Sequence, residues 1–220
     1  MAPDSEAPVA WSLVVPVKVL VQAKSRLTGL SGQRRSQLAL AMAADTVAAA
    51  IHAASVAAVL VVTDDPEVSD AAGGIGATVL ADAPAAGLNE ALRFGAGYAR
   101  DRWPDQGVAG LAADLPALRP EELTRALASA GNLHVSFVPD AAGTGTTLYA
   151  AVPGAPFRPR FGPLSRRQHL ADGAAEIAAG GQLAGLRRDV DTVDDLRLAA
   201  ALGLGARTRA VLALDAEIMN

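Results

Sequence analysis

The sequence predicts an α/β domain with a mostly parallel sheet flanked by helices on both faces. Short apolar runs rich in valine and leucine alternate with longer helical stretches, which is the pattern of repeated βαβ units. The chain has 220 residues, enough for one large domain with a substantial core. Hydrophobic residues make up 51% of the chain, much of it alanine, and aromatic residues only 4%, which favours helices packed closely on a sheet.

The apolar runs predict these strands: Ser12–Val17, Val56–Thr63, Thr78–Leu80, Val108–Ala113, His134–Val138, Thr147–Val152 and Leu186–Val190. The stretches between them predict these helices: Gly32–Ala50, Pro66–Ala72, Leu88–Arg102, Pro120–Ala130, Ser165–Ala179 and Val193–Leu202, with a last helix after Gly203. Two start signals support these assignments. Pro120 precedes two glutamates at a helix start, and Thr192 with Asp195 resembles a capping box.

The composition excludes several classes of protein. Residues 1–8 contain Asp4, Ser5 and Glu6 together with two prolines, so we expect a disordered tail over residues 1–10 before a single domain over residues 11–220. The longest apolar run, Val47–Val62, contains His52 and Ser55 and predicts a helix end followed by a strand rather than a membrane span. The absence of cysteine excludes disulfides and a cysteine nucleophile and fits a cytoplasmic protein. The net charge of −4 lacks the basic footprint of a duplex nucleic-acid binder.

Aspartates follow two of the predicted strands and are candidate metal ligands. Asp114 ends a buried run and is followed by Leu115 and Pro116, a position that faces the ligand crevice in a Rossmann-like sheet. Asp189 and Asp191 alternate on the last predicted strand and could both face the same crevice. Magnesium takes one or two carboxylates together with substrate phosphates, so Asp114 and one of this pair would suffice. The structural alternatives are a turn aspartate at Asp114 and a helix cap formed by Asp191 and Thr192.

Basic residues follow the first strand and are candidates for binding a triphosphate. Lys18, Lys24 and Arg26 lie in a loop that also contains two glycines and opens a helix. Backbone N–H groups at a helix start attract anions, and the cations would neutralise them. A basic surface loop explains the same residues equally well, because the pattern is neither a Walker loop nor GxGxxG.

The irregular segment 139–165 has the composition of a site for a small anion. Its five-residue stretch Gly143–Thr147 contains three hydroxyls and two glycines, which suits either an anion held by backbone amides or a plain turn. Gly162 and Ser165 open a predicted helix, where an anion site and a simple N-cap are both compatible. Asn89 could read a base edge or cap a helix.

The three histidines lack metal-ligand spacing, so we predict structural roles for them: His52, His134 and His169. No plausible Ser/His/Asp set stands out in the chain.

Five motifs resemble, in order, those of the CofC/FbiD guanylyltransferases, a family of the nucleotidyltransferase superfamily with a Rossmann-like, GT-A-type fold. They are Val15–Lys18 with Ala23–Leu27, Asp114–Pro116, Gly143–Thr147, Phe161–Ser165 and Asp189–Thr192. The resemblance covers about Ser12 to Leu196. Each motif is weak alone, and the five in register are specific. The chain departs from the wider superfamily at two points: its first loop lacks the double glycine, and Val193 stands where a proline is common.

The resemblance implies a reaction in the biosynthesis of a deazaflavin redox coenzyme, coenzyme F420. The phosphate of phosphoenolpyruvate or of 2-phospho-L-lactate would attack the α-phosphorus of GTP, and pyrophosphate would leave. It implies that Asp114 and Asp189 or Asp191 hold Mg²⁺.

The remaining implied roles concern the two substrates. Lys18, Lys24 and Arg26 would face the triphosphate, with Lys24, Arg26 and Asp114 as the catalytic set. Asn89 would face the guanosine. Thr147, Gly162 and Ser165 would bind the three-carbon acid.

The alternatives are other activities of the same fold. An alanine-rich, lysine-poor chain is usual for high-GC bacteria, whose branch of the family is associated with phosphoenolpyruvate; this favours that acceptor over 2-phospho-L-lactate. A molybdopterin or sugar-phosphate nucleotidyltransferase and a non-catalytic GTP-binding protein are further alternatives. The partners expected are GTP, the acid and a downstream enzyme that takes the unstable product, with no nucleic acid or membrane. The last helix could pack within the chain or in a homodimer.

Overall fold

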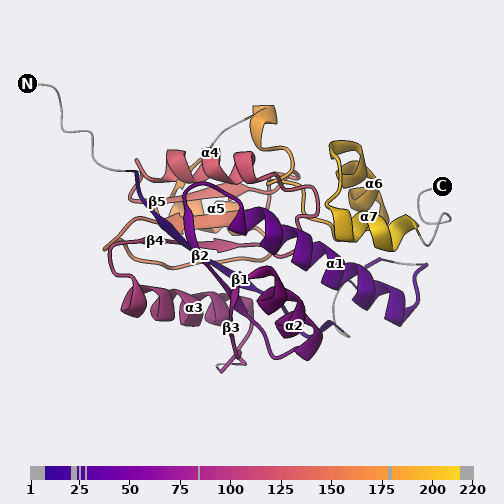
Figure 1. Ribbon diagram of the computed structural model, residues 1–220. Helices are drawn as coiled ribbons and strands as arrows, with labels where there is room; N and C mark the ends of the chain where they lie inside the picture. Colours follow the sequence, from indigo (N-terminus) through magenta and orange to yellow (C-terminus); the bar gives the residue numbers. More distant parts are fainter. Residues whose placement is uncertain are drawn as a thin grey trace, which may run out of the picture.

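The computed structural model describes residues 8–20, 24, 26–27, 29–83, 85–177 and 180–213 (Figure 1). Its strands are β1 (Trp11–Pro16), β2 (Val56–Val62), β3 (Thr78–Leu80), β4 (Gly107–Leu111), β5 (Val135–Pro139), β6 (Thr146–Ala151) and β7 (Ala175–Glu176). Its helices are α1 (Gly32–Ile51), α2 (Pro66–Ile75), α3 (Leu88–Arg102), α4 (Pro120–Ala130), α5 (Ser165–Ala171), α6 (Val193–Leu202) and α7 (Ala206–Ala213), with a short 3₁₀ helix at Gly180–Leu183.

The strands form a seven-stranded sheet in the order β3-β2-β1-β4-β6-β5-β7. Four neighbouring pairs are parallel, and β6 runs antiparallel to both β4 and β5. The predicted α/β class, with a mostly parallel sheet flanked by helices, is therefore confirmed. In the described part of the chain, no helix is both long and apolar enough to cross a membrane.

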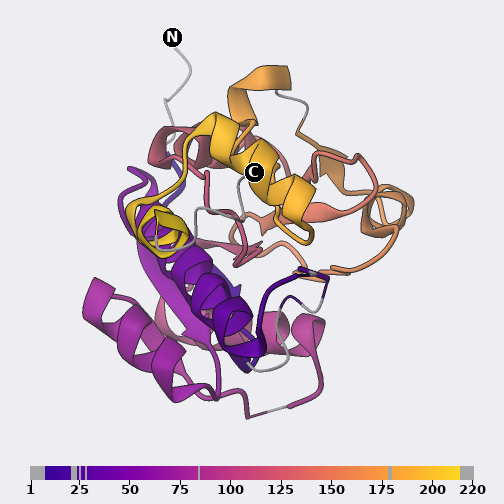
Figure 2. The same ribbon diagram turned by 90° about the vertical axis from the view of Figure 1, so that its right-hand side faces the viewer.

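Helices cover both faces of the sheet, as the two ribbon views show (Figures 1 and 2). Along β1, Leu13 and Val15 belong to the core beneath α1, α2 and α4, whereas Val14 belongs to the core beneath α3. The α3 face is completed by Phe157 and Phe161 of the loop that follows β6. Because both faces are buried, the strands read as continuous apolar runs, which made them recognisable in the sequence.

The C-terminal helix α7 packs within the chain against α1. Asp45, a buried residue of α1, accepts hydrogen bonds from the backbone N–H groups of Arg207 and Thr208 at 3.1 and 2.8 Å. The Asp45 carboxylate thus satisfies the first turn of α7 from another helix. The described helix α7 therefore packs within its own chain, against α1.

Two predicted elements are wrong. The predicted strand Leu186–Val190 is a turn followed by irregular chain, because Arg187 and Arg188 donate backbone hydrogen bonds to residues just before them in the chain, Leu183 and Gly185. The predicted helix Ser165–Ala179 ends at Ala171.

A left-handed glycine ends α5 early. Gly173 adopts a φ of 84°, and the chain then enters the short strand β7, which the sequence analysis had placed inside the helix. Ala178 and Ala179, the end of that predicted helix, lie outside the described residues.

Several predicted features lie partly outside the described residues. Of the expected tail over residues 1–10, residues 1–7 are not described, and the chain is described from Pro8. In the cationic loop, Lys24 and Arg26 are described, whereas Ser25 and residues 21–23 are not.

The sheet has a switch point between β1 and β4. From β1 the chain continues to β2 and β3 on one side, then returns to form β4 on the other side of β1. In open parallel sheets, ligands bind at the carboxyl ends of the strands at such a point. The loops after Pro16 and Leu111 both leave the sheet here, and this is where the candidate site lies.

Candidate active site

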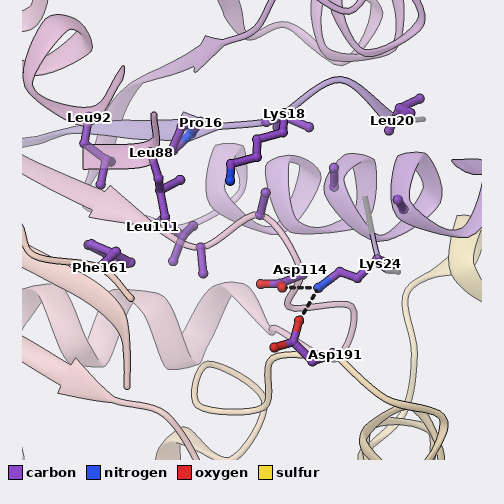
Figure 3. Close-up of a pocket in the computed structure, with 15 residues that line it drawn as sticks. Pro16, Lys18, Leu20, Lys24, Leu88, Leu92, Leu111, Asp114, Phe161 and Asp191 are labelled. Carbon is purple, nitrogen blue, oxygen red and sulfur yellow. Dashed lines mark hydrogen bonds and ion pairs between the residues drawn. The ribbon is translucent and has the colours of Figure 1, made fainter. Parts of the chain in front are cut away.

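A pocket of about 360 Å³ opens at the carboxyl ends of β1 and β4 (Figure 3). It is lined by Pro16, Val17, Lys18, Leu20, Lys24, Ala39, Ala43, Leu88, Leu92, Leu111, Ala112, Ala113, Asp114, Phe161 and Asp191. Leu88, Leu92, Leu111 and Phe161 form one end of the pocket, and Asp114, Lys24 and Asp191 lie toward the other (Figure 3). A concave apolar wall with a few convergent charged groups is typical of a small-molecule site.

Lys24 joins two aspartates from distant parts of the chain. Its Nζ forms an ion pair with Asp114 Oδ2 and lies 3.1 Å from Asp191 Oδ1. The Lys24 side chain is only 11% exposed. Burial alone would lower the pKa of Lys24, but Asp114 and then Asp191 outweigh burial, so the pKa is raised and the ammonium stays charged.

The backbone of Lys24 also has an unusual conformation. Its φ is +56°, in the left-handed region that non-glycine residues rarely adopt. Residues held in such conformations cluster at functional sites, where the surrounding contacts stabilise them. The described contacts of Lys24 are its two ion pairs and a hydrogen bond that its carbonyl accepts from the N–H of Leu27 at 3.0 Å.

Asp191 is free to face Lys24 because its neighbour caps the helix. Thr192 Oγ1 accepts the backbone N–H of Asp195, and the Asp195 carboxylate accepts that of Thr192, forming a capping box at the start of α6. Asp191 Oδ2 also lies 3.6 Å from Arg26, whose side chain is 76% exposed. Of the two sequence interpretations, capping therefore applies to Thr192 and the ionic role to Asp191.

A main-chain contact brings the two aspartates together. The backbone N–H of Val190 donates to the Asp114 carbonyl at 3.1 Å. Asp189, on the other side of Val190, is half-buried and has a pKa raised to about 7, by burial first and then by the nearby carboxylates of Asp114, Asp140 and Asp191. The expectation that alternation on a strand aligns Asp189 with Asp191 is wrong, because this segment is not a strand.

The acidic groups suit a divalent metal ion. Asp114 and Asp191 converge on one cationic centre, the Lys24 ammonium, and both offer hard oxygen ligands of the kind that Mg²⁺ and Mn²⁺ prefer. In the described residues, no three acidic or histidine side chains already form a ready-made metal cluster. Two carboxylates together with substrate phosphates would complete such a site.

None of the three predicted acceptor residues lines the pocket, although Thr147 bonds to Ala112 and Gly162 follows Phe161, both of which do. Thr147 is buried, its carbonyl accepts the N–H of Ala112 at 2.8 Å, and its hydroxyl has no hydrogen-bond partner among the described residues. Gly162 has a φ of 136°. Ser165 is fully buried, and its hydroxyl donates to Thr146 Oγ1 at 3.0 Å. The roles of all three residues stay predictions.

The remaining predicted residues differ in how they are engaged. Lys18 is exposed at the pocket and reaches into it (Figure 3). Asn89 does not line the pocket. Its side-chain amide is paired with the main chain of Phe161, accepting the N–H at 2.7 Å and donating to the carbonyl at 3.0 Å. Asn89 therefore fixes a wall of the pocket.

Asp140 organises the turn before β6 and was not among the predicted site residues. Its carboxylate accepts the backbone N–H groups of Thr144 and Gly145 at 2.9 and 2.8 Å, so these amides are already satisfied. The stretch Gly143–Thr147 therefore begins with a plain turn, so the amides of Thr144 and Gly145 are bonded within the protein rather than to an anion. An aspartate three residues before Gly143 is a signal for such a turn and could have been used.

The comparisons with known proteins identify the family. The family model described as "Guanylyl transferase CofC like" matches residues 11–179. A phosphoenolpyruvate guanylyltransferase of Thermomonospora curvata is 56% identical over 208 residues, covering 94% of this chain and 91% of that protein. One of Streptosporangium roseum is 53% identical over 210 residues, covering 96% and 93%.

Solved structures share the fold at lower identity. A putative nucleotide-diphospho-sugar transferase of Desulfovibrio desulfuricans has a TM-score of 0.71 at 17% identity, covering 95% of this chain and 96% of that chain. A CMP:2-keto-3-deoxy-manno-octonic acid synthetase complexed with CTP has a TM-score of 0.52 at 18% identity, covering 88% and 98%. The fold is therefore that of the nucleotidyltransferases, and the chain belongs to the CofC guanylyltransferase family.

Proposed function

We propose that this protein joins GMP from GTP to phosphoenolpyruvate, giving enolpyruvyl-diphospho-5′-guanosine and pyrophosphate. The observation that carries the proposal is the partly buried ion-pair set of Lys24, Asp114 and Asp191 at the switch point of a nucleotidyltransferase fold. The names of the relatives at 50–56% identity support phosphoenolpyruvate as the acceptor.

The reaction needs little covalent work from the protein. A phosphate oxygen of the acceptor attacks the α-phosphorus of GTP, the bond from that phosphorus to the bridging oxygen breaks, and pyrophosphate leaves with the bond electrons. The attacking phosphate is already an anion, so no strong general base is required. The difficulty is to bring two polyanions together, which calls for positioning and for positive charge.

The residues of the pocket supply that charge. Lys18 and Lys24 line the pocket, and Arg26 lies at its rim beside Asp191. Asp114 and Asp191 would hold Mg²⁺, with Asp189 close by. A bound Mg²⁺ would neutralise charge on the phosphates and on the leaving pyrophosphate. Thr147, Gly162 and Ser165 would position the three-carbon acid, and Asn89 would act on the pocket through Phe161.

The product and substrates imply the setting of the reaction. The product is an unstable phosphoanhydride, so we infer a downstream enzyme that consumes it. Because GTP and phosphoenolpyruvate are cytoplasmic metabolites, we place the enzyme in the cytoplasm. We also predict a single catalytic domain over residues 11–220, which limited proteolysis would check. We predict that it assembles as a homodimer, which size-exclusion chromatography would check.

Pyrophosphate release tests the proposed function. The purified protein is incubated with Mg²⁺, with GTP or CTP, and with phosphoenolpyruvate, 2-phospho-L-lactate or a sugar phosphate, together with an enzyme that accepts the unstable product. We expect release with GTP and phosphoenolpyruvate. Preference for 2-phospho-L-lactate would change the acceptor and keep the reaction class. Turnover of sugar phosphates alone, or tight GTP binding without release, would overturn the proposal.

A further inference from the structure

His169 lies at the centre of a buried hydrogen-bond chain. Its side chain is fully buried, and its ring packs against Tyr149, Phe137 and Phe161 at centroid distances of 4.6, 5.3 and 6.4 Å. Both ring nitrogens are engaged: Nε2 accepts the backbone N–H of Arg160 at 2.9 Å, and Nδ1 lies 3.0 Å from Thr146 Oγ1.

These contacts determine the protonation state of the ring. A backbone N–H can only donate, so Nε2 must be the unprotonated nitrogen. In a neutral imidazole the proton then sits on Nδ1, from where it is donated to Thr146 Oγ1. Burial lowers the pKa of His169 to about 4, against an opposing effect of Asp172 and with a further lowering by Arg160, so the ring is neutral near pH 7.

The chain fixes a functional segment at both of its ends. The segment 160–165 begins at Arg160, whose N–H is held by His169, and ends at Ser165, whose hydroxyl donates to the same Thr146 oxygen that His169 contacts. Between them lie Phe161, which lines the pocket, and Gly162. One imidazole therefore sets the distance between the two ends of this segment.

We propose that His169 is a positioning residue for the acceptor, holding segment 160–165 in the geometry that binds the three-carbon acid. This inference rests on the proposed function and deepens it. The nucleotide phosphates are assigned to Lys18, Lys24 and Arg26, none of which is hydrogen-bonded to the His169 chain in the described residues. A defect at His169 should therefore affect the acceptor far more than GTP.

Steady-state kinetics of three variants tests the proposal. His169→Phe keeps an aromatic ring and removes both hydrogen bonds, so we expect the KM for phosphoenolpyruvate to rise on the order of tenfold or more, with the KM for GTP nearly unchanged. His169→Gln retains an acceptor near Nε2, and His169→Asn retains a donor near Nδ1. Each should recover part of the loss. His52→Gln, at an exposed histidine that ends α1, is the matched control and should behave as wild type.

The tautomer provides a second readout that needs no variant to be active. In ¹⁵N-labelled wild-type protein near pH 7, the His169 ring should give one protonated nitrogen at Nδ1 and one unprotonated nitrogen at Nε2, assigned by their loss in His169→Gln. An Nε2–H tautomer would overturn the geometry.

The kinetic outcomes separate the two proposals. Equal changes in both KM values, or only a lower melting temperature, would show a purely structural role and overturn the inference. If the wild type turns over no three-carbon phosphorylated acid, the proposed function fails and the acceptor role of His169 fails with it.

Discussion

At the scale of single residues, Asp114 and Asp191 both form ion pairs with the Lys24 ammonium and are the metal ligands that we propose. Each carboxylate compensates the charge of Lys24, and we expect each to bind a divalent cation when phosphates bring more negative charge into the pocket. Their contribution to catalysis should therefore exceed their contribution to stability.

We expect Asp114→Asn and Asp191→Asn each to lower kcat on the order of 10²–10³, by analogy with the loss of one transition-state donor. The isosteric amide keeps the volume and removes the charge that a metal requires. Pyrophosphate release at saturating GTP and acceptor measures the effect. Asp70→Asn, at an exposed position on α2, is the control and should leave kcat unchanged. A loss below threefold in both site variants would refute the assignment.

Lys24 and Arg26 are predicted to differ in importance because their environments differ. Lys24 is 11% exposed and paired with two carboxylates, whereas Arg26 is 76% exposed and lies 3.6 Å from Asp191, where water screens its charge. We expect Lys24→Gln to reduce kcat/KM on the order of 10²–10³ and Arg26→Gln about tenfold or less. Measuring both variants at low and high salt gives the check: a larger defect for Arg26→Gln would contradict it.

At the scale of elements, Asp45 is the residue that attaches α7 to α1. Asp45→Ala would leave the backbone N–H groups of Arg207 and Thr208 without their acceptor, so we expect a loss of about 1–3 kcal/mol in the free energy of unfolding. Urea denaturation provides the measurement. Asp194→Ala, which removes an 85% exposed partner of Arg197, should cost under about 0.5 kcal/mol. Similar losses in the two variants would disprove the anchoring role.

The elements were predictable where local signals and burial agree. Leu88–Arg102, Pro120–Ala130 and Val193–Leu202 match the observed helices because helical stretches and start signals coincide there. The strand prediction for Leu186–Val190 was wrong although Leu186 and Val190 are buried, as residues of an inner strand are. The backbone N–H groups of Arg187 and Arg188 instead form the local hydrogen bonds of a turn. Helix α5 was overextended because alanines continue past Gly173.

Residues of the candidate site could be predicted from the sequence only where they belong to a recognisable motif. Lys24, Asp114 and Asp191 were candidates from their motifs, and the structure brings them together. Asn89 and Phe161 are 72 positions apart in the sequence, and Asp45 and Thr208 are 163 positions apart. No local sequence pattern predicts hydrogen bonds between residues so far apart. The links of His169 to Thr146 and Arg160 depend on how β6 and α5 pack, which composition and spacing do not specify.

At the scale of the whole molecule, two buried groups give opposite dependences of stability on pH. The native pKa of His169 is lowered to about 4 from an ordinary 6.5, so the unfolded chain binds more protons and stability falls as the pH drops from 6.5 to 4. The pKa of Asp189 is raised to about 7, so the native protein binds more protons and stability falls as the pH rises through the same range. The two contributions therefore have opposite signs in the wild type.

We therefore predict that the stability advantage of wild type over His169→Phe shrinks by about 2–3 kcal/mol between pH 7 and pH 4.5, because only the wild type carries the neutral buried imidazole. Urea denaturation of both proteins across this range, without metal, checks the difference. His52→Gln should show no such change. A constant difference across the range would show that His169 is protonated in the native state without cost.

The hydrogen bond from Val190 to Asp114 has a consequence for how the protein is made. Every strand of the described sheet precedes residue 177, whereas Asp191 follows all of them, next to the residue that makes this contact. A nascent polypeptide on the ribosome can thus emerge with all strands synthesised and still lack half of its carboxylate pair. We therefore expect the pocket to acquire its proposed chemistry only once residue 191 has been synthesised, after all the strands of the described sheet.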